Sequence, residues 1–431
     1  MPSDDEPSFE AKLFRPIILA GTLLLFVIPS LFTLAIFWNR KKIKSSSYFL
    51  PQKKFKRSII DLKPIAGAAE TIVQNVQNQI INPNYEVNSE RIKADPSDEQ
   101  QVLGRGCFGV VVKGTFDGKK AAIKCAKDVN IGYAEFWLDV RARESLYQEA
   151  CLLSFLPQNM NVLRLKGAVT KGWKEGGQLR MALELCDDNL QHILLKVKSD
   201  KKFINQLCHL SNEEAAKLKT ATKMVYQHER GDVVKPSKSD QLTTSDLLSF
   251  GYQTSLGMQF LCSYQCLHRD LAPRNILVKR IDDQWIVKIC DFGLARQMEE
   301  SMNYYQQLRG AAQPANWISP EAFLSQKFSP AADVWSYGIV LYELFTLGTT
   351  PYGNKTREEI EKELKAENER LITTRPEYCH EELFNFFENC WYYDSTRRPT
   401  FGTCAVQLEN HLQRANPEQL QLLQKLLFMN E

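Results

Sequence analysis

Residues 17–38 form an apolar stretch that carries no charged side chain. A helix rises about 1.5 Å per residue, so this stretch is long enough to cross the hydrocarbon core of a bilayer. A buried core helix and a cleaved signal peptide are the alternatives. A signal peptide would be shorter, and no small-residue cleavage site follows. We therefore predict a transmembrane helix over residues 17–38.

Lys and Arg cluster between positions 40 and 57, with no acidic residue before Asp61. Basic segments flank membrane helices on the cytoplasmic side, so residues 1–16 should form a short extracellular segment at the cell membrane. The basic side chains also predict contact with anionic membrane lipids. Residues 39–96 are interpreted as a juxtamembrane segment and linker that is helical in part.

Alternating apolar positions flank the sequence GRGCFG at residues 104–109, which predicts a β-hairpin rather than the strand-to-helix turn of a dinucleotide fold. Glycines at such positions let backbone amides approach phosphate groups. A further strand pattern ends at Lys124, and a point charge of this kind suits phosphates. Residues 134–156 then have a helical pattern, and residues 181–186 predict another strand.

The sequence LHRDLAPRNILV at residues 267–278 places a carboxylate, Asp270, five residues before an amide, Asn275. Apolar neighbours anchor the backbone, so the polar side chains belong to a loop. A second carboxylate, Asp291, stands in the sequence Asp-Phe-Gly after a strand-like run. One carboxylate to accept a hydroxyl proton and a second with an amide to hold metal ions are the groups that phosphoryl transfer needs.

With these motifs together, residues 97–412 resemble the protein kinase family, of the tyrosine-kinase kind. The resemblance implies an α+β bilobal fold, with a five-stranded antiparallel sheet and one helix in the N-lobe and a mostly helical C-lobe. One transmembrane helix would precede it. Residues 199–243 exceed what the fold needs, as in receptor-type kinases with an insert, and residues 413–431 would be a C-terminal tail. We expect the insert to be mobile and helical within residues 211–226.

The resemblance also assigns roles to particular residues. Glu149 is expected to pair with Lys124, with Glu144 as the second choice, and Arg274 is expected to help place the phenol beside the general base Asp270. Asn275 and Asp291 would hold Mg²⁺ or Mn²⁺. The residues implied in ATP binding are Leu103, Gly104, Gly106, Gly109, Val111, Ala122, Lys124, Glu184, Cys186 and Leu277.

Substrate class is indicated by Ala272 and Arg274, where serine/threonine kinases usually have Lys two residues after the Asp, and by Trp317. These residues resemble tyrosine kinases, although Pro273, Asn316 and Ser319 depart from that pattern. Autophosphorylation is expected at Tyr304 and Tyr305, with Arg269 and Arg296 as partners of the phosphate. Glu321 and Arg398 are expected to form a buried ion pair, and Asp333 to brace the catalytic loop.

Composition adds little to this picture. The net charge of +3 predicts no nucleic-acid partner, and the eleven cysteines lack metal-binding spacing. We therefore predict a membrane-anchored protein tyrosine kinase acting on protein substrates. Homo-association or a co-receptor is the expected route of input, because the short extracellular segment cannot fold alone. A catalytically weak kinase-fold scaffold is the alternative, but none of the catalytic groups is missing.

Overall fold

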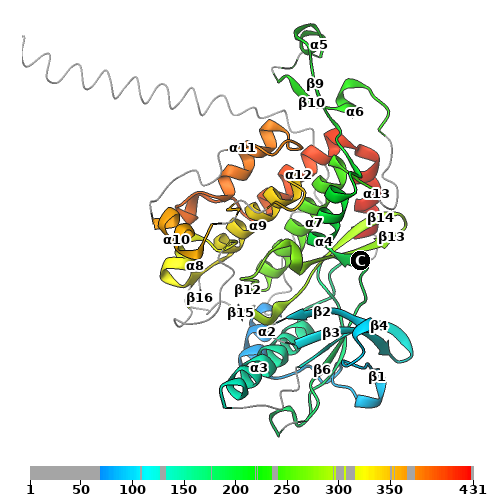
Figure 1. The fold of residues 1–431 in the computed structure, drawn as a ribbon, viewed down its shortest axis with the longest axis vertical. Helices are drawn as coiled ribbons and strands as arrows, with labels where there is room; N and C mark the ends of the chain where they lie inside the picture. The colour runs from blue at the N-terminus through cyan, green and yellow to red at the C-terminus, as the bar shows by residue number, and fades with distance from the viewer. Residues whose placement is uncertain are drawn as a thin grey trace, which may run out of the picture. The chain divides into compact units, whose positions relative to one another are not determined.

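The computed structural model describes residues 68–106, 109–126, 133–175, 177–218, 220, 222–234, 241–294, 296–297, 305–306, 316–349, 352–353, 355–365 and 374–428. The predicted membrane helix and the basic segment lie outside these residues. Among the helices that are described, none is long and apolar enough to cross a membrane. Residues 62–431 form one compact unit, in which the sheet with α3 lies at one end and most helices lie at the other (Figure 1).

The N-lobe is built on one antiparallel sheet of six strands, in the order β1-β3-β4-β6-β5 with β2 also paired to β3. Period-two alternation sorts its side chains, because Val110, Val112 and Ile123 enter a hydrophobic core. Val111 and Lys124, which are cross-strand partners, lie on the opposite face. The strands are β1 (Ile92–Lys93), β2 (Val102–Gly106), β3 (Gly109–Phe116), β4 (Lys119–Cys125), β5 (Leu165–Val169) and β6 (Arg180–Leu183).

The prediction of five strands is wrong by one. The additional strand, β1, has only two residues and pairs with the end of β3. Gly114 allows this approach, because a Cβ there would collide with the backbone carbonyl oxygen of Lys93. A two-residue strand has too little alternation to be recognised in sequence.

Two helices accompany this sheet. The long helix α3 (Tyr133–Phe155) has nearly the bounds that the periodicity predicts. The shorter α2 (Ala68–Gln77) gives the linker the helical part that we expected, and it buries Ile72 and Val73. Beyond α2, the side chain and backbone of Asn82 bond to Ser154 at the end of α3.

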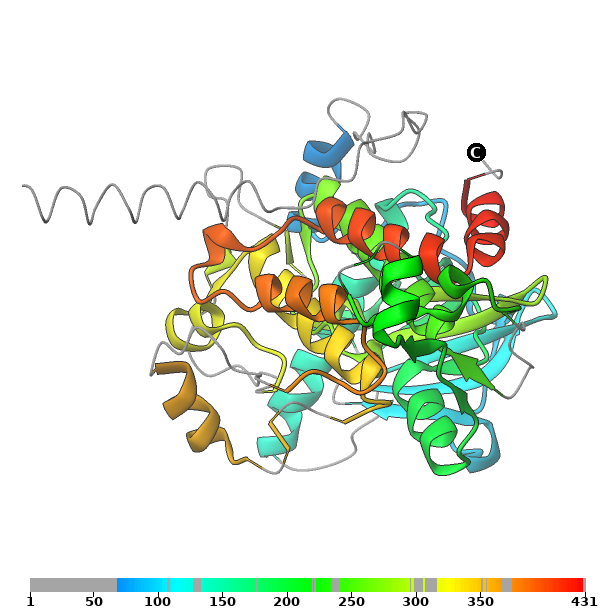
Figure 2. The same ribbon diagram turned by 90° about the horizontal axis from the view of Figure 1, so that it is seen from above.

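The C-lobe is mostly helical, and Thr243 and Ser329 cap its two central helices, α7 and α9. In Figure 2 the red C-terminal helices lie against the green α7. The helices are α4 (Leu190–Ser199), α7 (Thr244–Ser263), α8 (Pro320–Ser325), α9 (Pro330–Phe345), α10 (Arg357–Lys365), α11 (Glu381–Cys390), α12 (Phe401–Ala415) and α13 (Pro417–Phe428).

Residues 417–428, which the sequence assigned to a tail, form the packed helix α13. Its residues Leu420, Leu423 and Leu427 are buried at the helical spacing of three and four. The end of α12 and α13 are separated by one residue, Asn416, whose side chain accepts a hydrogen bond from the Gln419 N–H. This part of the chain therefore belongs to the core of the C-lobe.

Short strands of the C-lobe carry the loops of the site. Strand β13 lies between β7 and β14, while β12 pairs with β15 and β16 pairs with β17. Their bounds are β7 (Asp188–Asn189), β12 (Cys266–Leu267), β13 (Ile276–Ile281), β14 (Gln284–Ile289), β15 (Arg296–Gln297), β16 (Tyr305–Gln306) and β17 (Lys327–Phe328).

Most of the described residues of the insert belong to short helices and strands. Within the stretch expected to be helical, α5 (Asn212–Lys217) is a helix capped by Ser211, but β10 (Met224–Tyr226) is a strand paired with β9 (Leu207–His209). The other elements are β8 (Phe203–Ile204), α6 (Gln227–Arg230) and β11 (Leu242–Thr243). Figure 1 shows α5 and the β9–β10 pair projecting from the C-lobe.

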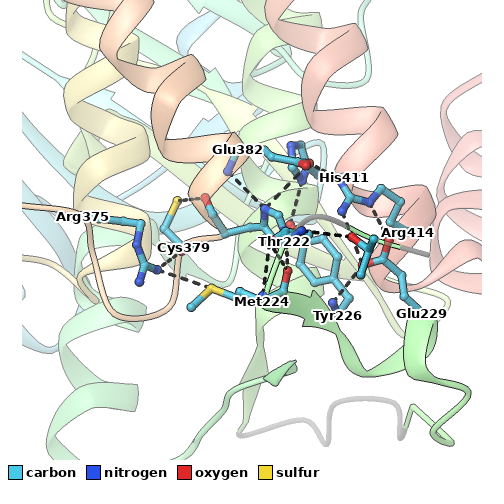
Figure 3. Close-up of polar contacts among 11 residues, drawn as sticks. Thr222, Met224, Tyr226, Glu229, Arg375, Cys379, Glu382, His411 and Arg414 are labelled. Atoms are coloured by element: carbon cyan, nitrogen blue, oxygen red, sulfur yellow. Dashed lines mark hydrogen bonds and ion pairs between the residues drawn. The ribbon is translucent and has the colours of Figure 1, made fainter. Parts of the chain in front are cut away.

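A buried cluster fixes the base of this projection (Figure 3). The hydroxyl of Tyr226 lies 2.9 Å from Nδ1 of His411, and its ring stacks on His380. Arg414 contacts Glu229 of the insert at 2.8 Å and also bonds to a carboxylate of α11. We call Tyr226, Glu229, His380, His411 and Arg414 the insert anchor. It joins the insert to α11 and α12, which lie far from the insert along the chain.

Candidate active site

The glycine-rich sequence forms the hairpin of β2 and β3, as its alternation predicts. Gly104 pairs with Val111, and Gly106 pairs with Gly109 across the strands. Leu103 sits at an irregularity in this register and is 43% exposed. A Cβ on Gly109 would collide with the carbonyl oxygen of Cys125, so a side chain cannot be accommodated there.

Lys124 lies at the centre of a charged cluster. Its ammonium group is 2.7 Å from Glu149 of α3 and 2.9 Å from Asp291. Burial alone would lower the pKa of Lys124, but the two carboxylates outweigh burial and raise it. The same ammonium lowers the pKa of Asp291 against the effect of burial, so both groups remain charged. The predicted partner of Lys124 is thus Glu149, while Glu144 is exposed.

The segment after β14 is held in place by α3 and by an unusual backbone conformation. Asp291 has a φ of 62°, which a residue with a side chain adopts rarely and at a cost in energy. The hydroxyl of Ser145 in α3 donates to the carbonyl oxygen of Gly293 at 2.6 Å. Glu149 and Ser145 lie one turn apart, so the same face of α3 holds Lys124 and the segment that carries Asp291.

His268 connects this segment to the catalytic loop. Its Nε2 lies 3.1 Å from the carbonyl oxygen of Cys290, and its Nδ1 accepts from the backbone N–H of Asp270. Its ring also packs on Phe292, with the centroids 5.4 Å apart. The histidine therefore fixes the two carboxylates, Asp270 and Asp291, relative to each other.

Asp333 supports the backbone of the catalytic loop, as predicted. Its two carboxylate oxygens accept from the backbone N–H groups of His268 and Arg269, each at 2.9 Å. Arg269 has a φ of 68°, so this strained residue needs such support. Asp333 belongs to the first turn of α9, which is buried in the C-lobe.

Asp270 is surrounded by donors. Asn275 donates from its amide nitrogen to Oδ2 of Asp270 at 2.9 Å, and Arg274 donates to Oδ1. Burial raises the pKa of Asp270, while Arg274 opposes this effect. Arg274 in turn lies over the ring of Trp317, 4.4 Å from its centroid. The loop thus presents a carboxylate whose orientation is fixed by a cation on one oxygen and an amide on the other.

The hinge between the lobes has polar contacts that sequence reasoning missed. The backbone N–H of Glu184 bonds to the carbonyl oxygen of Arg164, and its side chain lies 2.9 Å from Nζ of the buried Lys288. Ala122 pairs with Leu183 just before this hinge, and Leu277 lies on β13. Cys186 is partly buried. A lysine in a strand pattern gave no signal of this ion pair.

Two further expectations concern the region beyond Asp291. Arg398 contacts both oxygens of Glu321, at 2.7 and 2.9 Å, and its side chain is fully buried, so the predicted ion pair is present.

Tyr304 lies outside the described residues, as does the side chain of Arg296. The backbone of Tyr305 pairs with Phe328, whose ring contacts the guanidinium group of Arg269.

Comparison with known proteins accounts for this arrangement. A family model described as protein tyrosine and serine/threonine kinase matches residues 98–408. The receptor-like tyrosine-protein kinase kin-15 of Caenorhabditis elegans is 30% identical over 88% of this chain and 78% of its own length. This chain belongs to the protein kinase family, among the receptor-like tyrosine kinases.

Other relatives of this kinase are much longer. The tyrosine-protein kinase receptor ver-3 of Caenorhabditis elegans is 33% identical over 75% of this chain, but over 27% of its own length. Vascular endothelial growth factor receptor 1 of Rattus norvegicus is 33% identical over 78% of this chain and 26% of its own. The similarity to these receptors thus covers about a quarter of each.

Proposed function

We propose that this kinase is anchored in the cell membrane and transfers the γ-phosphate of ATP to tyrosine hydroxyls of protein substrates. The observation that carries the proposal is the environment of Asp270, whose carboxylate is held between Arg274 and Asn275 beside the ring of Trp317. A carboxylate oriented in this way can accept the proton of a phenol.

In the proposed reaction, the phenol oxygen attacks the γ-phosphorus while its proton passes to Asp270. The bond between the γ-phosphorus and the bridging oxygen breaks, and ADP leaves. Lys124, held by Glu149, is placed to contact the phosphates of the nucleotide. Arg274 donates to one oxygen of Asp270 and lies over the ring of Trp317. We therefore assign the orientation of the acceptor tyrosine to Arg274 and Trp317.

The residues of the site fit ATP with Mg²⁺ or Mn²⁺. The amide nitrogen of Asn275 donates to Asp270, so the carbonyl oxygen of Asn275 and the carboxylate of Asp291 are the oxygen donors left for a metal. Mg²⁺ prefers such ligands and would neutralise the phosphate charge. The glycine hairpin, with Leu103, Val111, Ala122 and Leu277, and the hinge from Glu184 to Cys186 would hold the nucleotide.

Anchoring rests on residues 17–38 and on the relatives, which are named as receptors or receptor-like kinases. The basic residues that follow support a catalytic domain on the cytoplasmic side, next to anionic lipid. Association of two copies, or a co-receptor, would bring kinase domains together. An epitope tag before Met1 should then be reached by antibody on intact cells, and a tag after Glu431 only after permeabilisation; the reverse labelling would contradict this orientation.

Activation by autophosphorylation of Tyr304 and Tyr305 is part of the proposal. Its support is the pairing of Tyr305 with Phe328, which lies against Arg269 beside the catalytic Asp270. A phosphate on this segment would find a cation near it. Replacing both tyrosines by Phe should lower activity on added peptide, and a fully active preparation without phosphate at either position would contradict this step.

The activity is tested with the full chain, purified in detergent, on peptides that differ only in carrying Tyr, Ser or Thr. Tyr peptides should be phosphorylated in the presence of Mg²⁺ or Mn²⁺. Asp270→Asn should lower turnover by about a hundredfold or more and leave ATP affinity nearly unchanged, because the carboxylate acts on the acceptor. Asp283→Asn, an exposed carboxylate on the β13–β14 turn, is the control. Unchanged turnover in Asp270→Asn would refute the proposal.

A further inference from the structure

One buried carboxylate of the C-lobe, Glu343, plays no part in the machinery described above. It lies in α9, a helix whose other inward-facing side chains are mostly apolar, and it is 1% exposed. Burial raises the pKa of Glu343 to about 7. Burying a carboxylate is costly unless its contacts compensate, so its contacts need an explanation.

The carboxylate of Glu343 has one hydrogen bond among the described residues. Its Oε2 accepts a hydrogen bond of 2.7 Å from the indole N–H of Trp317, whereas Oε1 has no hydrogen-bond partner there. The same helix also holds the backbone of the tryptophan, because the hydroxyl of Ser336 donates to its carbonyl oxygen at 2.6 Å. Two residues seven positions apart on α9 therefore hold Trp317 at its backbone and at the edge of its ring.

Trp317 also contacts a residue of the acceptor site. The guanidinium group of Arg274 lies 4.4 Å from the centre of the Trp317 ring and also donates to Asp270. A cation is attracted to an aromatic face by the electron density of the ring. An indole N–H that donates to a carboxylate makes the ring more electron-rich, so Glu343 both fixes the indole and strengthens its attraction for Arg274.

We propose that Glu343 is a positioning residue for the acceptor tyrosine, acting through Trp317 and Arg274 on the orientation of Asp270. This role rests on the proposed tyrosine kinase activity. It concerns the acceptor side alone, because Lys124 and Asp291, the groups assigned to the nucleotide and metal, make none of these contacts. The loss of Glu343 should therefore affect the peptide and not ATP.

The test compares two replacements of Glu343 in the full chain. Glu343→Met keeps the length and removes the acceptor, and it should lower kcat/KM for a tyrosine peptide by about tenfold with an unchanged KM for ATP. Glu343→Gln keeps an oxygen that can accept from the indole N–H, so kcat/KM should stay within about threefold of the parent. A residue that only supports the fold would not give this difference between peptide and nucleotide.

A matched control is Glu409, a half-buried carboxylate of α12 whose pKa burial also raises and which accepts from Gln424 at 2.6 Å. Glu409→Met and Glu409→Gln should leave both KM values unchanged. A Glu343→Met enzyme with an unchanged kcat/KM for the peptide would overturn the proposal. So would equal losses in the Met and Gln variants that include a raised KM for ATP.

Trp317→Phe gives an independent reading if Glu343→Met does not fold. It keeps an aromatic face below Arg274 but removes the N–H that reaches Glu343. Like Glu343→Met, it should lower the peptide kcat/KM by about tenfold with an unchanged KM for ATP, and Glu343→Gln should cause no further loss in this background, because no N–H is left to donate to residue 343. Additive losses would refute the coupling. A parent enzyme inactive on tyrosine peptides would instead refute the proposed function.

Discussion

In the active site, Lys124 lies between two carboxylates and keeps its charge, whereas in the insert anchor two histidines are buried in their neutral form. At the centre of each cluster the side chains are buried, namely Lys124 and Glu149 in the active site and His380 and His411 in the anchor. The active site pairs groups of opposite charge, so burial strengthens their attraction. In the insert anchor, burial and the nearby Arg414 lower the pKa values of His380 and His411.

The hydrogen bonds of the anchor show why neutral histidines suit it. Nε2 of His380 lies 2.8 Å from the carbonyl oxygen of Met224 and must donate, while Nδ1 accepts from the backbone N–H of Glu382. A protonated ring could no longer accept at Nδ1. The carboxylates of Glu229 and Glu382 also face these rings, but both are engaged by Arg414. The comparison teaches that a buried group keeps its charge beside opposite charges, as Lys124 does, whereas burial next to the cation Arg414 favours the neutral form of the two histidines.

The largest effect is expected when one charge is removed from the active site. Glu149→Gln should lower turnover on the order of a hundredfold, because Lys124 loses one of the two carboxylates that hold it. Glu144→Gln, an exposed change on the same helix, is the control and should leave turnover unchanged. Steady-state kinetics on a tyrosine peptide measures both. Equal turnover in the parent and in Glu149→Gln would show that the charge of this carboxylate is not needed for activity, and the contrast with the insert anchor would be lost.

A smaller effect, on stability and not on catalysis, is expected in the insert anchor. Arg414→Met should lower the free energy of unfolding by about 1–2 kcal/mol, since it leaves two carboxylates without their partner. Its side chain is 27% exposed, so solvent screens part of the interaction. Urea unfolding measures the change, and Arg230→Met, which breaks an exposed pair with Asp232, should have less effect. A large fall in turnover with Arg414→Met would link the insert to catalysis.

The last effect depends on pH. The folded-state pKa values of His380 and His411 lie below their unfolded values, so the native state binds fewer protons. Stability from this source is complete above the unfolded pKa, near 6.5, and falls as pH decreases below it. From pH 7.5 to 5.5 the loss is at most about 1.4 kcal/mol for each histidine.

Melting temperatures at the two pH values test this expectation. Changing His380 and His411 together to Gln should flatten the difference, while His192→Gln, at an exposed histidine, should not. A parent protein that melts at the same temperature at both pH values would show that the anchor histidines do not titrate on unfolding. It would then remove the contrast with the charged active site.

The sequence predicted much of the candidate site because each motif is local. The alternation around Gly104 and Gly109 indicates a hairpin, and the spacing of Asp270 and Asn275 is that of one loop. These features need only residues that are neighbours along the chain.

Sequence reasoning failed where an element is defined by distant partners. Strand β1 exists because Ile92 and Lys93 meet the end of β3, and α13 is core because its leucines pack on the C-lobe. Residues 211–226 of the insert were expected to be helical, but Met224–Tyr226 form a strand paired with β9. Tyr226 contacts His411, 185 positions further along the chain, and no local pattern reveals this contact.

What the sequence determined by itself is therefore the set of groups on which the proposed chemistry rests, since the types and spacings of Lys124, Asp270, Asn275 and Asp291 are fixed along the chain. Only the tertiary structure decided which groups support that chemistry, as with Glu343 below Trp317 and Ser145 beside Gly293. The physical reason is that a hydrogen bond depends on a few ångströms in space. The number of residues between two groups says almost nothing about their distance in space once the fold brings remote helices together.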